Sequence, residues 1–175
     1  INLIRNIVNN TLPDANTTGF VVSNAADSDN DLNVADAIAI VNKILGHLQQ
    51  TVGKQIPTGP VTIILSEPFQ LPNGQQVLPV RLDGQAIIAG AQAVFRFDPE
   101  SLDVGTPIIP EEMAGLFIDS RLEDGTLRVL IHGMSPDTRL SVDQSPILLI
   151  PITPRHEGRV GLTLTDAVLA DWGAQ

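Results

Sequence analysis

The spacing of apolar residues changes near residue 50, and this change constrains the fold more than any other feature of the sequence. Before it, apolar residues recur at helical spacing within residues 1–10 and 38–46, which predicts two short helices. After residue 60, apolar and polar residues alternate in short runs such as Leu127-Arg128-Val129, and Asp-Gly, Gly and Pro separate the runs. Short strands separated by turns are typical of an antiparallel sandwich or barrel. We therefore expect a helical part followed by an all-β part.

The stretch between the two parts has the composition of a linker. Residues 47–60 contain two glycines, two prolines and a Gln49-Gln50 pair, and they show no apolar period. We therefore predict a helical module over residues 1–46, a linker over 47–60 and a β-sandwich over 61–175. The two short helices can bury little surface alone, so they should pack against each other. A parallel, doubly wound sheet is not expected, because no long helix alternates with the strands.

Composition excludes several classes of protein. The 175 residues include 10 Lys and Arg against 20 Asp and Glu, a net charge of −10, which argues against nucleic-acid binding because that binding needs Lys and Arg to neutralise phosphates. The absence of cysteine excludes disulfides, thiolate metal sites and cysteine nucleophiles. No apolar run approaches the ~20 residues that span a bilayer. The chain begins at Ile1 without Met, so we expect a mature or excised fragment.

The densest chemical signal is an acidic segment over residues 27–36, directly before the second helix. It carries four aspartates with no Lys or Arg among them. Crowded carboxylates repel one another, and a bound hard cation is the usual way to hold them together. The alternating oxygen-bearing side chains are similar in spacing to an EF-hand calcium loop. The segment therefore predicts a calcium site.

Two registers fit this calcium loop. If Asp36 is its last ligand, Asp27 and Asp29 take the second and third ligand positions and Ala25 stands at the first, where a water could substitute. A rival register makes Asp27 the first ligand and needs a two-residue deletion before Asp36. The other hypothesis is a solvated acidic turn in which Asp36 caps the helix. Both calcium registers use much the same candidate ligands: Asp27, Asp29, Asp31, Asn33 and Asp36.

These motifs resemble a known pair of families. Residues 27–46, a calcium loop followed by a helix ending in Leu45-Gly46, are similar to the second repeat of a dockerin, and residues 1–10 resemble the helix of the first repeat. Residues 88–99, which end in Phe97-Asp98-Pro99, resemble a strand and turn of a cohesin, and residues 162–169 resemble its closing strand. The resemblance implies a calcium-folded helical module joined to a nine-stranded jelly-roll sandwich. Dockerins of the family have two calcium loops and one is visible here, so either the first loop lies upstream of Ile1 or this dockerin is degenerate.

The resemblance also implies a function. Cohesins bind dockerins, so the chain is expected to be a non-catalytic, calcium-dependent assembly module of the extracellular space or cell surface of a bacterium or archaeon. Its partners would be cohesin or dockerin modules of other proteins or of a second copy, as in a homodimer. On the dockerin side Val34 and Ala35 would contact the partner, where many cellulosomal dockerins carry Ser or Thr. On the cohesin side Gly90 and Gln92 stand where family members often carry Asn and Asp.

Other functions remain as alternatives. A carbohydrate-binding sandwich is the main one, although such modules stack sugars on aromatic rings and this chain has one tryptophan, Trp172, and no tyrosine. An enzyme is not expected, because Gly133-Met134-Ser135 lacks the second glycine of a nucleophile elbow and the three histidines are scattered. A chain that carries both halves of a recognition pair can self-associate, recognise two partners or fold back on itself. The linker reaches at most ~45 Å, which permits the last arrangement.

Overall fold

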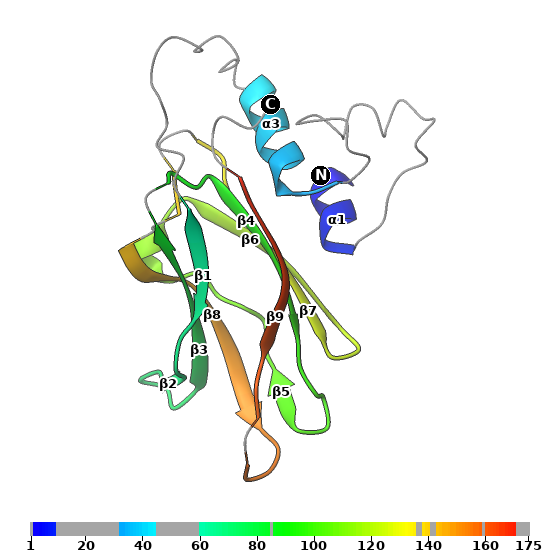
Figure 1. Cartoon of the computed structure of the whole chain (residues 1–175), viewed down its shortest axis with the longest axis vertical. Coiled ribbons are helices and arrows are strands. Elements are labelled where there is room, and N and C mark those ends of the chain that lie inside the picture. The colour runs from blue at the N-terminus through cyan, green and yellow to red at the C-terminus, as the bar shows by residue number, and fades with distance from the viewer. Residues whose placement is uncertain are drawn as a thin grey trace.

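In the part of the chain that the structure describes, the alternating runs after residue 60 form nine strands, and the helical spacing before residue 45 forms two short helices (Figure 1). The computed structural model describes residues 2–9, 32–44, 60–84, 86–135, 138–140, 143–158 and 160–170. The helices are α1 (Asn2–Asn9) and α3 (Val34–Ile44), and a 3₁₀ helix, η2, spans Glu111–Met113. The strands are β1 (Val61–Leu65), β2 (Phe69–Gln70), β3 (Gln76–Gly84), β4 (Gly90–Arg96), β5 (Leu102–Val104), β6 (Leu116–Glu123), β7 (Thr126–Gly133), β8 (Asp143–Pro154) and β9 (Thr163–Ala170).

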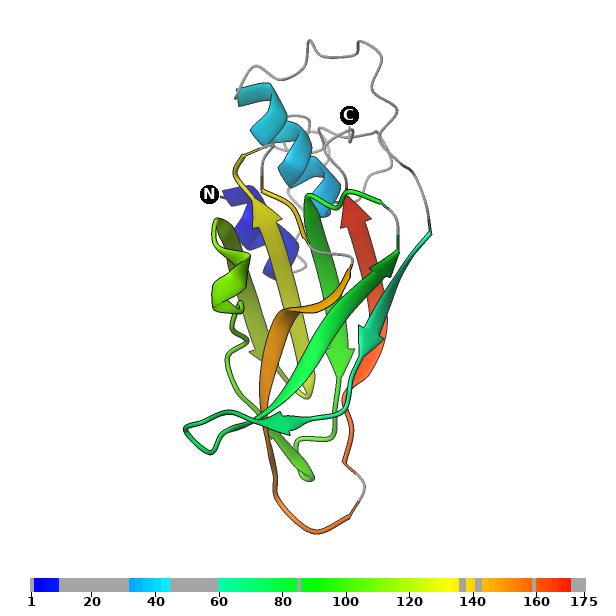
Figure 2. The same ribbon diagram turned by 90° about the vertical axis from the view of Figure 1, so that its left-hand side faces the viewer.

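The strands form two antiparallel sheets. One has the order β1-β3-β8-β5, with β2 paired to β3, and the other has the order β6-β7-β4-β9. Figure 2 shows the four strands of the second sheet side by side in this order. The two sheets face each other across the core, so the two-sheet β-sandwich expected from the sequence is confirmed. The linker predicted over residues 47–60 stays a prediction, because all of it except Pro60 lies outside the described residues.

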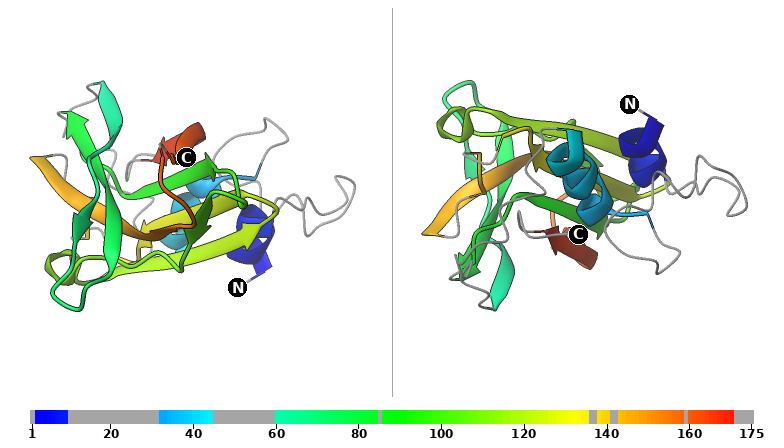
Figure 3. Two further views of the ribbon diagram at one scale, coloured as in Figure 1. Left: turned by 90° about the horizontal axis from the view of Figure 1, so that it is seen from below. Right: turned by 90° about the horizontal axis from the view of Figure 1, so that it is seen from above.

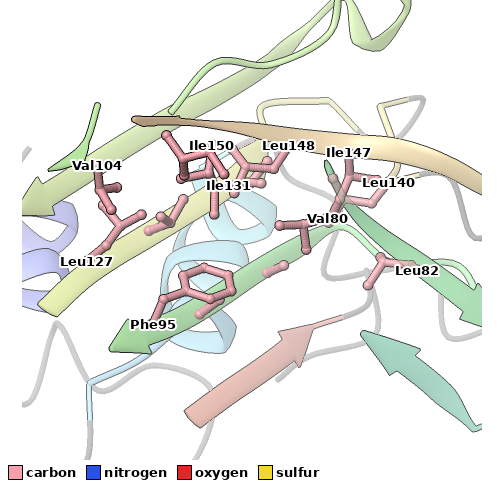
Figure 4. Close-up of a cluster of buried hydrophobic side chains, with 14 of the residues drawn as sticks. Val80, Leu82, Phe95, Val104, Leu127, Ile131, Leu140, Ile147, Leu148 and Ile150 are labelled. Atoms are coloured by element: carbon pink, nitrogen blue, oxygen red, sulfur yellow. The ribbon is translucent and has the colours of Figure 1, made fainter. Parts of the chain in front are cut away.

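The core between the sheets is built from the apolar side of each strand. Phe95 of β4, Leu127 of β7 and Leu148 and Ile150 of β8 are all almost completely buried there (Figure 4). Burying a side chain of this size stabilises a fold by about 1.5–3 kcal/mol relative to exposure. The alternation along β4 and β7 therefore fixes which side chains face the core and which face outward.

A tight turn joins β6 to β7. Glu123 pairs with Thr126, and the two turn residues, Asp124 and Gly125, have φ angles of 46° and 71°. Two consecutive positive φ angles define the type I′ hairpin that Asp-Gly favours. Glycine is also required by space, because a Cβ at Gly125 would lie 2.6 Å from the carbonyl oxygen of Phe97. The Asp-Gly pair in the sequence predicts this hairpin, and the structure confirms it.

Both helices lie on the side of the second sheet that faces away from the first sheet (Figures 1 and 3). Helix α1 contacts β6 and β7, whereas α3 contacts β4, β7 and β9. The helices also contact each other, as the sequence predicts, but the sheet completes their packing. Two helices of this length have too little apolar surface to form a stable pair alone. Within the described part of the chain, no helix has the length and apolar character needed to cross a membrane.

Candidate docking surface

The outward face of the second sheet is unusually apolar at the end where the helices lie. Side chains alternate across a strand, so Leu130 faces outward because its neighbours Val129 and Ile131 face the core. Leu130 is nonetheless completely buried, because the helices cover it. We call this surface the outer shelf, defined by small and apolar residues of β4, β7, β9 and the residue before β4: Ala89, Gly90, Leu130, Val168 and Ala170.

One face of each helix is buried against the outer shelf. Val34 and Ile38 of α3 have no exposed surface, and they lie four residues apart on the same side of the helix. Ile7 and Val8 of α1 belong to the same buried cluster. A Cβ at Gly90 would lie 2.7 Å from Val34 Cγ2 and 3.4 Å from Ile38 Cδ1. The absence of a side chain at Gly90 therefore lets α3 approach the backbone of β4.

The start of α3 is held by two side chains that accept hydrogen bonds from backbone N–H groups. The Ala35 N–H donates to Asn33 Oδ1 over 2.8 Å, and the Asn33 N–H donates to Asp36 Oδ2 over 3.0 Å. This arrangement resembles a capping box: Asn33, the residue before the helix, accepts from the N–H of the second helical residue, and Asp36, the third helical residue, accepts from the N–H of Asn33. The helix cap is thus Asn33, with Asp36 closing the box. The box makes Val34 the first helical residue and so positions it over Gly90.

Two of the predicted calcium ligands therefore shape the start of α3. Asn33 and Asp36 are both buried, and Asp36 is only 1% exposed. The other three candidates, Asp27, Asp29 and Asp31, lie outside the described residues. Among the residues that the structure does describe, no group of three or more His, Asp or Glu side chains could hold a metal ion.

Helix α1 is anchored to the edge strand β6 by a cation. Arg121 Nη1 donates to Asn9 Oδ1 over 3.0 Å and to the Asn9 carbonyl oxygen over 3.4 Å. Asn9 is the last residue of α1, so the guanidinium lies where the helix has unsatisfied carbonyls and the negative end of its dipole. Arg121 Nη2 also forms a 2.7 Å ion pair with Glu123 Oε2. The contact thus joins Asn9 and Arg121, which are 112 positions apart in the sequence.

A buried histidine lies on the same outward face as Leu130. His132 is 4% exposed, and its ring stacks on Phe117 of β6 with a centroid separation of 5.8 Å. Burial lowers the pKa of His132, against the opposing effects of the Gly133 carbonyl and the Asp119 carboxylate. The imidazole is therefore neutral at pH 7. Phe117 itself is 52% exposed, so apolar surface continues beyond the helices.

The surface also contains an unsatisfied polar atom. Gln92 lies on β4 between Leu130 of β7 and Val168 of β9 in the register of the sheet. Its Oε1 is buried and has no hydrogen-bond partner among the described residues. A buried acceptor without a partner costs about 1–3 kcal/mol. The packing of the helices on the sheet is therefore not optimal at Gln92.

The structure brings together residues that the sequence analysis assigned to opposite partners. Val34 contacts Gly90, Ala35 packs against the same cluster, and Gln92 lies two residues further along β4.

Sequence reasoning missed Leu130 and Arg121. The signal for Leu130 was available, because an apolar residue on the outward side of a core strand indicates that this side is also covered. The candidate sugar platform, Trp172, lies outside the described residues.

Comparisons with known proteins identify the fold. No family model and no curated protein matches the sequence. The structure is similar to a non-cellulosomal cohesin from the archaeon Archaeoglobus fulgidus, with a TM-score of 0.51, 14% identity and coverage of 65% of this chain and 80% of that chain. It is also similar to a type II cohesin domain from the cellulosome of Acetivibrio cellulolyticus, with a TM-score of 0.51, 15% identity and coverage of 68% and 87%.

A third similar structure is a complex. It is an interface mutant of a type II cohesin–X-dockerin complex from Acetivibrio cellulolyticus, matched with a TM-score of 0.53 at 10% identity over 67% of this chain and 90% of that chain. At these identities the similarity concerns the fold. The β-sandwich of this chain therefore has the fold of cohesin modules.

Proposed function

We propose that the chain is a non-catalytic protein–protein assembly module whose docking surface is the outer shelf. The observation that carries this proposal is the seating of Val34 and Ile38 on the shelf around Gly90. Small and apolar residues on the outward face of a sheet form a patch that soluble proteins rarely leave bare unless it binds a partner. The shelf accommodates short helices with β-branched residues four positions apart.

The cohesin fold supports a partner of the dockerin type. One of the similar structures is described as a complex between a type II cohesin and an X-dockerin. By analogy, the partner of this chain is a helical module of that kind, carried by another protein or by a second copy of the chain. By the same analogy, we propose that the protein works outside the cell or on the cell surface of a bacterium or archaeon.

Calcium is the cofactor we assign to the helical part, with Asp27, Asp29, Asp31, Asn33 and Asp36 as ligands. The spacing of these five oxygen-bearing side chains in the sequence supports this assignment, because crowded carboxylates repel one another unless a cation compensates them. The described bond of Asp36 to the Asn33 N–H is compatible with ligation, since an ionised carboxylate offers about four lone-pair sites. Calcium would neutralise the clustered aspartates and hold the start of α3. It would thereby hold Val34 in place.

Fluorescence anisotropy tests the docking function directly. The probe is a fluorescein-labelled peptide of residues 1–46 in calcium buffer, and the receptor is the full chain with Val34→Glu and Ile38→Glu, which removes its own helix from the shelf. Saturable binding is expected. Adding Gly90→Arg to this receptor should abolish binding, whereas Gly161→Arg should not, because the position of a Cβ at Gly161 has no atom within 4 Å. A receptor that never binds the peptide would contradict the docking function.

A further inference from the structure

We infer that the docking surface is self-occluded: α1 and α3 act as its ligand in cis, and a partner must displace them before it can bind. This inference rests on the proposed function and adds its regulation. The outer shelf is fully covered where it is most apolar, at Leu130 and Ala89. A second helix could not reach Gly90 while Val34 lies 2.7 Å from the Cβ position there.

The helices depend on the sheet for their order. Helix α1 has 8 residues and α3 has 11. Isolated helices shorter than about 12–15 residues are marginal in water, so the apolar shelf supplies much of their stability. Displacement would therefore remove the support of both helices at once. The switch has two states, one with ordered helices on the shelf and one with an open shelf.

Attachment in the same chain favours the occluded state. Residues 45–59 connect α3 to the residue before β1, and a short tether of this kind gives the attached helices an effective concentration of the order of millimolar. If the detached helices bound the open shelf with a Kd of ~10 μM, this effective concentration would weaken the binding of any competing partner about 100-fold relative to an open chain. Occlusion of this kind raises the intrinsic affinity that a partner needs in order to bind, so weak partners are excluded.

Helices α1 and α3 leave one polar atom and one apolar side chain of the docking surface without a matching contact, and these two groups indicate the chemistry of the partner. Gln92 Oε1 is buried without a hydrogen-bond partner among the described residues, and Phe117 at the margin is half exposed. A helical partner that offers a hydroxyl or amide donor to Gln92 and an apolar side chain to Phe117 would make contacts that α1 and α3 do not make. Such a partner can displace the two helices although their covalent attachment gives them a high effective concentration at the shelf.

A disulfide trap tests whether the contact forms within one chain. The Cβ position at Gly90 lies 2.7 Å from Val34 Cγ2, which is one bond from Val34 Cβ, so the two Cβ atoms are within reach of the ~3.5–4.5 Å that a disulfide needs. The natural chain has no cysteine, so Val34→Cys with Gly90→Cys creates a single defined pair. Oxidation should give a crosslinked monomer on a non-reducing gel. A crosslinked dimer would overturn occlusion in cis, and an absence of crosslinking would overturn the contact itself.

Binding of the labelled peptide of residues 1–46 then tests the consequence. The wild-type chain should bind at least 10-fold more weakly than the full chain with Val34→Glu and Ile38→Glu. The disulfide variant should bind more weakly when oxidised than when reduced, a comparison in which the substitution at Gly90 is the same in both states. Equal binding by wild type and opened chain would overturn self-occlusion while leaving the docking function intact. Failure of the opened chain to bind, with its β-sheet circular dichroism and thermal unfolding of the sandwich unchanged, would overturn the docking function and this inference together.

Discussion

Val34 Cγ2 of α3 lies only 2.7 Å from the point that a Cβ on Gly90 of β4 would occupy. Real Cβ atoms do not approach other heavy atoms so closely, so a side chain at position 90 would force a shift of the helix. The other nearest atom, at 3.1 Å, is the carbonyl oxygen of Ile131, which belongs to the rigid neighbouring strand. The helix is therefore the element that would move.

Replacing Gly90 with alanine should loosen α3 without unfolding the sandwich. Overpacking at a tight contact costs about 1–3 kcal/mol, and here that cost falls on the helix–sheet contact. We expect faster native-state hydrogen exchange of the α3 amides and a lower free energy of unfolding in urea. The matched control is Gly161→Ala, where no atom lies within 4 Å of the new Cβ. Adding Val34→Ala to Gly90→Ala should restore part of the protection, and a complete lack of restoration would contradict the contact.

Arg121 should stabilise α1 specifically. Arg121→Gln removes the charge-assisted hydrogen bonds to Asn9, which are worth about 1.5–3 kcal/mol when one partner is ionised, less a discount because the arginine side chain is 35% exposed. Hydrogen exchange of the α1 amides should rise while that of β3 and β8 stays unchanged. Glu123→Gln breaks only the partly exposed ion pair and should change stability by no more than about 1 kcal/mol. Equal effects of the two substitutions would show that Asn9 is not the partner that matters.

Acidification should destabilise the folded chain through His132. Burial lowers the pKa of His132 below its ordinary value of 6.5, so the unfolded chain binds the proton more readily than the folded chain. The free energy of unfolding should therefore be fully present above pH 7 and should fall as pH drops through 6.5 and below. Urea denaturation between pH 5.5 and 7.5 measures this slope. His132→Gln should flatten it, whereas the same substitution at the exposed His156 should leave it in place. If the free energy of unfolding fell as steeply with acidification in His132→Gln as in wild type, a group other than His132 would be responsible for the pH dependence.

Gln92→Leu should stabilise the occluded state. The substitution removes a buried acceptor that has no partner among the described residues, and it extends the apolar surface between Leu130 and Val168. Removing such a group should raise the free energy of unfolding by about 1 kcal/mol. Gln76→Leu, on an exposed position of β3, is the control and should change stability by no more than about 0.5 kcal/mol. A loss of stability in Gln92→Leu would show that the amide is satisfied in solution.

The sequence predicted the sandwich better than it predicted the surface. The period of two fixed the core face of β7, and Asp124-Gly125 fixed the hairpin, because both signals are local. The contact between Asn9 and Arg121 spans most of the chain, and no local pattern encodes it. The sequence analysis named Gly90 only through the resemblance to cohesins. No local pattern marks its role, because that role depends on the absence of a side chain where α3 approaches β4. Leu130 could have been found, because it is apolar on the outward side of a strand whose inward side is also apolar.

Calcium should order the helical part without changing the sandwich. Adding calcium to the chelated 175-residue chain should raise the helical circular dichroism at 222 nm and the thermal midpoint of that signal, while chelator should leave the β-sheet signal intact. Asp29→Asn should abolish this response without touching the capping box of Asn33 and Asp36. Asp36→Ala should remove both the response and the cap, so it should also lower helicity in chelator. Asp103→Asn, an exposed carboxylate on β5, should respond as wild type does. If Asp29→Asn kept the full calcium response, or if wild type had none, the acidic segment would serve only to start the helix.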